Sequence, residues 1–296
     1  MIERRYTGSK PKTVMPPGAI DTQLHLYLPG FPAQPGGPDL PPALPGPCEY
    51  QQVMAWLGIE RLVVTQRNAH QFDNSNLLSC LEAMGTCARG VAVIDASTSD
   101  QEIETLHLCG VRGARIMDLP GGAVGLNGLS GVDAKAADAG WMLAVQFNGS
   151  DIVDHFENLS RIRSRWVLDH HGKFFRGAQP DGSEVDMVKR LIDGGNVWFK
   201  FSGCYESSRS GGPDYADIAA IARAIADYAP ERIIWGTNFP HNFAQTTADY
   251  PNDARLLDTS LSWLPNDAAR HLALVDNPEE LFDFPPITAA PARQQQ

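Results

Sequence analysis

The sequence lacks the features that mark secreted, disulfide-bonded and membrane proteins. Its 296 residues include only five cysteines, an odd number with no C-x-x-C spacing, which is typical of reduced thiols. No apolar run approaches the roughly 18 residues of a membrane span. Residues 1–17 also lack the apolar segment found in secretory signals. These absences favour a cytoplasmic protein that does not contact a membrane.

Positive charge is also scarce. The 24 Lys and Arg residues against 35 Asp and Glu residues give a net charge of −11, which argues against a nucleic-acid partner. A small anionic substrate is still allowed, because a few local arginines can override the net field. We find no G-x-S-x-G, P-loop or G-x-G-x-x-G motif, so those hydrolase and nucleotide-binding signatures are absent.

What the sequence does contain is a regular alternation of short apolar segments and amphipathic stretches. The predicted strands are 19–25, 61–67, 88–95, 111–117, 141–148, 165–171, 196–202 and 232–238. The predicted helices are 48–58, 74–84, 100–109, 150–163, 183–193, 214–229, 252–263 and 266–282. Eight strand–helix units predict an α/β fold of the (β/α)8 TIM-barrel type, with a doubly wound open sheet as the alternative.

The length allows two domains, but one barrel of about 250 residues accounts for it equally well. We predict an N-terminal extension (1–18), a single barrel domain (19–284) and a loose C-terminal tail (285–296). Residues 29–47 are dominated by Pro and Gly and follow the first strand. In a barrel this loop would lie over the active site as a lid or pocket wall; a surface excursion is the alternative.

Polar residues gather at the ends of the predicted strands, where a barrel has its active site. Alternation along a strand places Asp21, Gln23 and His25 on one inward face, and Lys200 one layer deeper, where it could pair with Asp21. The last inward residues are Gln23, His25, Arg67, Asp95, Arg115, Gln146, His170, Ser202 and Asn238. The same rule turns His171 and Arg112 away from the barrel interior. So many buried polar groups need partners, which indicates a binding pocket.

Six motifs run in order along the chain: IDTQLH, DNSNLLSCL, GVRGARIM, VLDHHGK, FKFSGCY and WGTNFPH. Together they resemble the amidohydrolase superfamily, in particular its branch of 2-pyrone-4,6-dicarboxylate lactonases. Single motifs are weak, but six in the same order are specific. The resemblance implies an amidohydrolase-like TIM barrel that acts on a lactone.

The departures from the family pattern bear on mechanism. Gln23 stands where the family has its first metal-binding histidine, and Asn238 stands where it has an aspartate at the end of the eighth strand. Gln and Asn are poor ligands, and His25 and His170 alone are too few, so we expect no metal and no other cofactor. In the lactonase branch the resemblance implies a metal-independent reaction in which that aspartate activates water. Asn238 cannot do so.

The expected function is therefore the metal-independent isomerisation of a sugar-diacid 1,5-lactone to the 1,4-lactone, by attack of the substrate's own hydroxyl. Hydrolysis of a sugar-acid or pyrone-dicarboxylate lactone is the alternative, and a barrel that only binds a sugar acid is the third. We assign catalysis to His25, His170, Asn238 and Gln23. The expected substrate-binding residues are Arg115, Arg67, His70, Gln146, Ser202 and Tyr205. A homo-oligomer is compatible with the sequence.

Overall fold

The computed structural model describes residues 2–244 and 246–287. Eight parallel strands follow one another in the order β1 to β8, which confirms the barrel and excludes the doubly wound sheet. The strands are β1 (Ile20–Leu24), β2 (Arg61–Thr65), β3 (Ala88–Ala92), β4 (Val111–Asp118), β5 (Met142–Phe147), β6 (Trp166–Leu168), β7 (Val197–Phe201) and β8 (Ile233–Trp235). Each coincides with a predicted segment.

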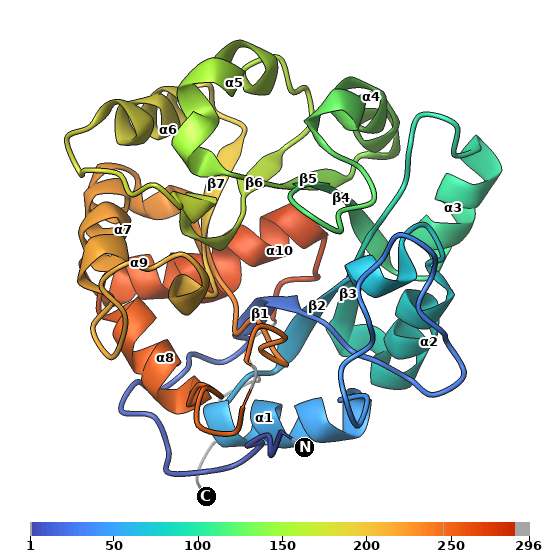
Figure 1. Ribbon diagram of the computed structural model, residues 1–296, viewed down its shortest axis with the longest axis horizontal. Helices are drawn as coiled ribbons and strands as arrows, with labels where there is room; N and C mark the ends of the chain where they lie inside the picture. The colour runs from blue at the N-terminus through green and yellow to red at the C-terminus, as the bar shows by residue number, and fades with distance from the viewer. Residues whose placement is uncertain (1, 245, 288–296) are drawn as a thin grey trace, which may run out of the picture.

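The helices form a ring around the strands (Figure 1). They are α1 (Pro47–Leu57), α2 (Ser75–Met84), α3 (Asp100–Leu108), α4 (Leu129–Ala139), α5 (Ile152–Leu159), α6 (Ser183–Asp193), α7 (Ala216–Tyr228), α8 (Asp253–Leu261), α9 (Asp267–His271) and α10 (Asn277–Phe282). Ser99 caps α3, its side chain accepting a hydrogen bond from the backbone amide of Glu102 at 3.2 Å. The sequence patterns missed α4. They predicted a single helix at 266–282, and α9 and α10 are joined there without a break by a π-helical turn at Leu272–Asp276. No helix within the described residues is both long and apolar enough to cross a membrane.

The barrel closes where β8 returns to β1. Beyond the short β8 strand, the backbone N–H of Asn238 donates to the Gln23 carbonyl, and the backbone N–H of His25 donates to the Phe239 carbonyl, both at 2.8 Å. Gly236 allows this approach, because a Cβ there would lie 2.6 Å from Cβ of Gln23. Closure therefore brings the ends of β1 and β8, with two predicted site residues, into direct contact.

Apolar side chains fill the barrel interior, and α10 covers the end of the barrel opposite the site. The inward cluster consists of Ile20, Val63, Val91, Met142, Ala144, Val167, Trp198 and Ile234, packed against Leu281, Phe282 and Phe284. A second, larger cluster fills the space between strands and helices. The interior is thus a packed core, and polar groups concentrate at the strands' C-terminal ends.

Two of the predicted side-chain orientations are wrong. The pairing of β1 with β2 shifts register between Asp21 and Leu24, so Asp21 points outward and accepts a hydrogen bond from Tyr50 of α1 at 2.6 Å. Lys200 therefore does not pair with Asp21; its Nζ lies 2.7 Å from Asp169 Oδ1. In β6, alternation counted back from His170 predicts that Trp166 and Leu168 face the interior. Instead Val167 faces the interior, and Trp166 and Leu168 belong to the outer cluster.

The Pro/Gly-rich loop at 29–47 packs along the chain that follows β2. The Gln34 amide donates to Ala69 O at 2.7 Å, and a Cβ at Gly37 would lie 2.5 Å from Asn68 O. The loop forms part of a surface cavity beside the barrel mouth through Pro38 to Pro42. That cavity shares Arg67 with the candidate active site. Of the predicted tail at 285–296, residues 288–296 lie outside the described residues.

Candidate active site

A cavity of about 250 Å³ opens at the C-terminal ends of the strands. Its lining consists of His25, Arg67, Arg115, Met117, Leu119, Pro120, Gln146, His170, Lys173, Phe175, Glu206, Asn238 and Phe243. Of the ten predicted site residues, the structure brings six to this lining: His25, Arg67, Arg115, Gln146, His170 and Asn238. The ends of β1, β2, β4 and β5 and the turns after β6 and β8 supply these six side chains.

The other four predicted residues lie around the cavity and outside its lining. Gln23 is fully buried and its Oε1 accepts from Lys200 Nζ at 2.9 Å, while its Nε2 has no partner among the described residues. His70 contacts the Phe31 carbonyl at 3.3 Å. Ser202 is buried, and its hydroxyl has no partner among the residues that the structure describes. Tyr205 hydrogen-bonds to Asn238, which gives it a supporting position.

Arg115 is a buried cation whose hydrogen-bond partners are all neutral. Its guanidinium donates at 3.0 Å to Gln66 O, Asn68 Oδ1 and Gln146 Oε1, and its Nε has no partner in the described structure. Burial lowers the pKa of Arg115 to about 10, so it stays charged at neutral pH. A buried charge without a counter-ion in its hydrogen-bond shell is costly. A further bond goes to Met117 Sδ at 3.2 Å, so Nε is the donor left for a substrate carboxylate, which would supply the counter-ion.

His25 presents a free lone pair to the cavity. Its Nδ1 lies 2.8 Å from Thr65 O; a carbonyl only accepts, so Nδ1 carries the proton and Nε2 is the basic atom. Burial, with Arg67 and Arg115 next in importance, holds the pKa of His25 well below its usual range. His25 is therefore neutral at physiological pH and able to accept a proton.

His170 has the opposite arrangement. Its Nε2 lies 3.1 Å from Asn238 Oδ1, and its Nδ1 lies 3.5 Å from Asp169 Oδ2. Burial alone would raise the pKa of Asp169, but Lys200 and His170 hold it below its usual range, so Asp169 is ionised. Residues 170, 171 and 173 all have φ near +50°, and this left-handed turn carries His170 into the cavity. The turn directs His171 outward against Phe201.

Asn238 is held by groups that fix the orientation of its amide. Its Nδ2 donates to Glu206 Oε1 at 2.7 Å and to Tyr205 Oη at 2.8 Å. Glu206 in turn forms an ion pair with Lys173. Burial would raise the pKa of Glu206, but Lys173 keeps it below its usual range, so this carboxylate is ionised and can only accept. The amide nitrogen must face Glu206, which leaves Oδ1 toward His170.

Lys173 and Glu206 line the cavity, and the sequence analysis missed both of them. They lie on the turns after β6 and β7, beyond the strand ends where alternation applies. The signal available was their place beside the motifs, since Lys173 ends VLDHHGK and Glu206 follows FKFSGCY. Asp95, in contrast, ends a predicted strand but only accepts bonds from Ser97 and Thr98 of its own turn.

The donor set does not fit a metal ion. Among the described residues there is no group of three His, Cys, Asp or Glu side chains that could hold one. A metal ion bound by Gln23 would have to lie beside its Oε1. The Lys200 ammonium already occupies that place, 2.9 Å from Oε1. A cation would meet that ammonium and two neutral amides, which are poor ligands. We therefore derive no step through a metal.

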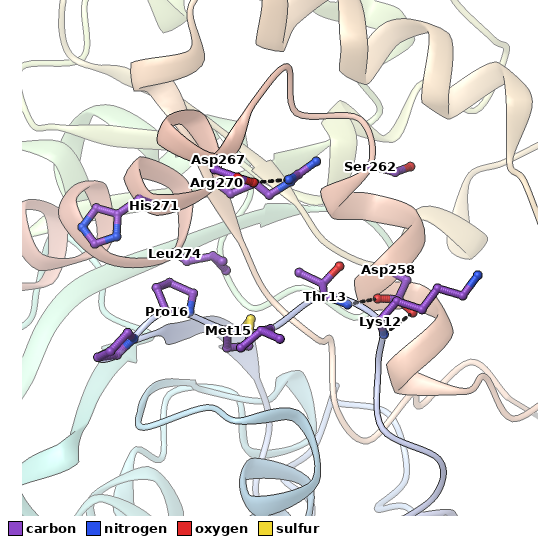
Figure 2. Close-up of a pocket in the computed structure, with 12 residues that line it drawn as sticks. Lys12, Thr13, Met15, Pro16, Asp258, Ser262, Asp267, Arg270, His271 and Leu274 are labelled. Carbon is purple, nitrogen blue, oxygen red and sulfur yellow. Dashed lines mark hydrogen bonds and ion pairs between the residues drawn. The ribbon is translucent and has the colours of Figure 1, made fainter.

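A larger cavity, of about 640 Å³, lies elsewhere on the molecule. Figure 2 shows the N-terminal segment crossing α8 there, with the amides of Lys12 and Thr13 donating to Asp258. Arg270 and His271 line its other side. This cavity lies between that segment and α8–α9 on the outside of the barrel, and it holds no strand-end residue. The smaller cavity at the strand ends is the better candidate, because barrel enzymes place their chemistry there.

The fold and the cavity together are those of a TIM-barrel enzyme, with a buried arginine and two histidines at the ends of its strands. The chain belongs to the amidohydrolase family, whose model matches residues 20–284. This confirms the resemblance inferred from the six motifs.

Relatives of known function are similar over nearly the whole chain. D-galactarolactone isomerase of Agrobacterium fabrum is 57% identical, covering 97% of this chain and 99% of the relative. A 2-pyrone-4,6-dicarboxylate hydrolase of Comamonas testosteroni is 29% identical, covering 93% of each. An apo crystal structure of an Agrobacterium tumefaciens protein, 57% identical, superposes with a TM-score of 0.94, covering 96% of this chain and 100% of that one.

Proposed function

We propose that the protein isomerises the 1,5-lactone of a sugar diacid, D-galactarolactone being the candidate, to the 1,4-lactone. The observation that carries this proposal is Asn238, an amide locked by Glu206 and Tyr205 at the place where the family has a carboxylate. The amide cannot take a proton from water. The rest of the site keeps an anion anchor, a base and an acid, which suffices for an internal acyl transfer. The name of the 57% identical relative supports the same reaction.

In the proposed reaction Arg115 binds the substrate carboxylate and thereby orients the ring. The C4 hydroxyl oxygen attacks the C1 carbonyl carbon, and its proton passes to Nε2 of His25. The C1–O5 bond then breaks, and O5 takes the proton from Nε2 of His170. In this step His170 reacts as an imidazolium whose Nδ1–H faces the ionised Asp169 carboxylate at 3.5 Å, so loss of the Nε2 proton leaves a neutral ring. One ester bond forms and one breaks, one proton is taken and one is given, and no water is consumed. Solvent exchange after product release restores both histidines.

Two features favour this route over attack by water. A neighbouring hydroxyl acts at an effective concentration of about 10⁵ M or more when well oriented, so it needs less help from a base. Arg67 adds positive charge to the cavity wall, which would stabilise the oxyanion of the tetrahedral intermediate, whereas the charge of Lys173 is balanced by Glu206. The catalytic set we propose is His25, His170 and Asn238, with Gln23 behind them. The binding set we propose is Arg115, Arg67 and Gln146.

The second candidate is hydrolysis, which the name of the 29% identical relative favours. NMR of candidate aldarolactones with the purified protein distinguishes the two reactions. We expect the 1,5-lactone to give the 1,4-lactone without proton release in weak buffer. An open diacid with one proton released per turnover would establish a lactonase.

Free thiols at all five cysteines support a cytoplasmic location for this chemistry.

A further inference from the structure

A chain of hydrogen bonds, part-buried at Tyr205 and buried between His241 and Asp253, leads from Asn238 away from the cavity to helix α8. Asn238 Nδ2 is 2.8 Å from Tyr205 Oη, which is 2.7 Å from His241 Nδ1, and His241 Nε2 is 2.9 Å from Asp253 Oδ1. His241 and Asp253 are 1% and 2% exposed. None of Tyr205, His241 and Asp253 lines the cavity, so their contacts with the site run through Asn238.

The direction of each bond follows from the ends of the chain. The Asp253 carboxylate accepts, so Nε2 of His241 carries a proton, and in the tautomer with that single proton Nδ1 is an acceptor. Tyr205 therefore donates its hydroxyl proton to His241, and its oxygen is left to accept from Asn238. The second hydrogen of the Asn238 side-chain amide is donated to Glu206, whose carboxylate is paired with Lys173. Both hydrogens of the Asn238 amide are thus occupied.

We infer that Tyr205, His241 and Asp253 are positioning residues that hold the amide of Asn238 with its oxygen toward His170. The consequence is that Nε2 of His170 keeps the proton which the leaving ring oxygen needs. This gives Tyr205 a role different from the substrate contact predicted for it. The inference rests on the proposed function for its kinetic consequence, but the orientation of the amide is a property of the resting protein.

The kinetic test is the Tyr205→Phe variant, which removes one acceptor and leaves the ring. We expect kcat to fall by about 10-fold, the scale of one buried hydrogen bond, with KM within about twofold of wild type. His241 provides a matched pair of variants. His241→Leu breaks the chain and should resemble Tyr205→Phe. His241→Gln can still donate to Asp253 and accept from Tyr205, so it should recover kcat to within about threefold of wild type.

A double-mutant cycle separates positioning from general structural support. In the Asn238→Ala background, Tyr205→Phe should lower kcat no further, because the group it positions is gone. The resting protein gives a second readout in the NMR signals of the Asn238 amide, identified by their loss in Asn238→Ala. One of the two amide protons should shift in Tyr205→Phe and in His241→Leu, and neither should shift in His241→Gln.

Several results would overturn the inference. A rise in KM that matches the fall in kcat/KM would make Tyr205 a substrate contact. An undiminished effect in the Asn238→Ala background would make it structural support. Unmoved amide signals in a folded Tyr205→Phe protein would also refute it, whatever the remaining activity. Failure of wild type to form the 1,4-lactone, with the amide signals behaving as expected, would refute the proposed function alone.

Discussion

His170 and Asn238 come from the turns after β6 and β8 and meet in one hydrogen bond, 3.1 Å from Nε2 to Oδ1. Gly203, on the turn after β7, lies directly against this pair. A Cβ at position 203 would be 2.9 Å from Asn238 Nδ2 and 3.0 Å from His170 Cδ2, and φ of Gly203 is +59°. The glycine of the FKFSGCY motif therefore allows two side chains that we propose to be catalytic to pack against the backbone of a third turn.

We expect Gly203→Ala to lower kcat by at least about 10-fold, since a displacement of the His170–Asn238 pair disturbs proton transfer. The added methyl cannot be accommodated without moving these two groups, and a left-handed alanine costs about 1–2 kcal/mol of stability. Steady-state kinetics and denaturant unfolding measure the two effects. Gly195→Ala is the matched control: its φ is +90°, but nothing lies within 4 Å of the added Cβ. It should cost stability and leave kcat in place.

Arg115→Met should raise KM sharply, because the variant removes the buried cation proposed to bind the substrate carboxylate. A charge-assisted hydrogen bond is worth about 1.5–3 kcal/mol, which corresponds to about 10–150-fold in KM. Arg112→Met is the control on the same strand; Arg112 faces outward and pairs with Asp283 at 3.1 Å. Equal KM values for the two variants would remove Arg115 from the binding site.

His171 should make the protein less stable as the pH falls. It packs against Phe201 and Trp263, neither ring nitrogen has a hydrogen-bond partner among the described residues, and burial lowers its pKa to about 3. The unfolded chain takes up this proton near pH 6.5 and the folded protein does not. Stability is therefore lost as pH falls below about 6.5.

Replacing His171 by Leu removes this proton uptake. Between pH 7.5 and pH 5.5 the wild type should lose about 1.4 kcal/mol of unfolding free energy relative to His171→Leu. Any constant difference between the two proteins, such as strain at the positive φ of this position, cancels in the comparison. Urea unfolding at the two pH values measures the effect. Parallel losses in both proteins would show that His171 titrates alike in the folded and unfolded states.

The comparison of sequence and structure shows where strand alternation works and where it fails. It placed Arg115 and Gln146 at the cavity because β4 and β5 run regularly. Asn238 also lines the cavity as predicted, but it lies beyond the end of β8 in a turn with φ of +66°. Alternation reversed β6, and His170 reaches the cavity only through the left-handed turn that follows. It failed at Asp21 because the register shifts within β1. Local patterns do not encode such irregularities.

The missed elements have similar physical causes. Helix α4 contains Gly131 and four alanines, so its apolar periodicity is weak, and its stability comes from packing in the outer cluster. Lys173 and Glu206 reach the cavity from turns, where no periodic rule applies, and they pair with each other across 33 residues of sequence. The Tyr205–His241–Asp253 chain depends on the barrel's closure and the docking of α8, which no single segment encodes.

Treatment with a chelator should leave the activity intact, and added Zn²⁺ should not increase it. The reason is that too few groups at the strand ends could bind a metal ion. Lys200 already donates a hydrogen bond to the side-chain oxygen of Gln23, and the other possible ligands there are His25, His170 and the neutral amide of Asn238. Elemental analysis of the purified protein, with activity assays before and after chelation, measures both quantities. A stoichiometric metal whose removal abolishes turnover would contradict this account of the site.

Asn238→Asp should create lactone hydrolysis, because a carboxylate at this position can take a proton from water. The new carboxylate would face Glu206 Oε1, which is now 2.7 Å from the amide nitrogen. Two facing carboxylates raise each other's pKa, and burial raises it further. The base form of the introduced aspartate therefore accumulates only as pH rises through that raised pKa, and hydrolysis should increase with pH over the same interval. Proton release in weak buffer and NMR of the open diacid measure it.

The double variant Asn238→Asp with Glu206→Gln separates the two causes of the raised pKa. A glutamine in place of Glu206 removes the like charge and can donate to the new carboxylate, so hydrolysis should begin at lower pH than in the single variant. The Glu206→Gln single variant is the control and should gain no hydrolysis, since Asn238 remains an amide. If neither aspartate variant releases protons at any pH while wild type isomerises the lactone, the amide at position 238 is not what withholds water from the reaction.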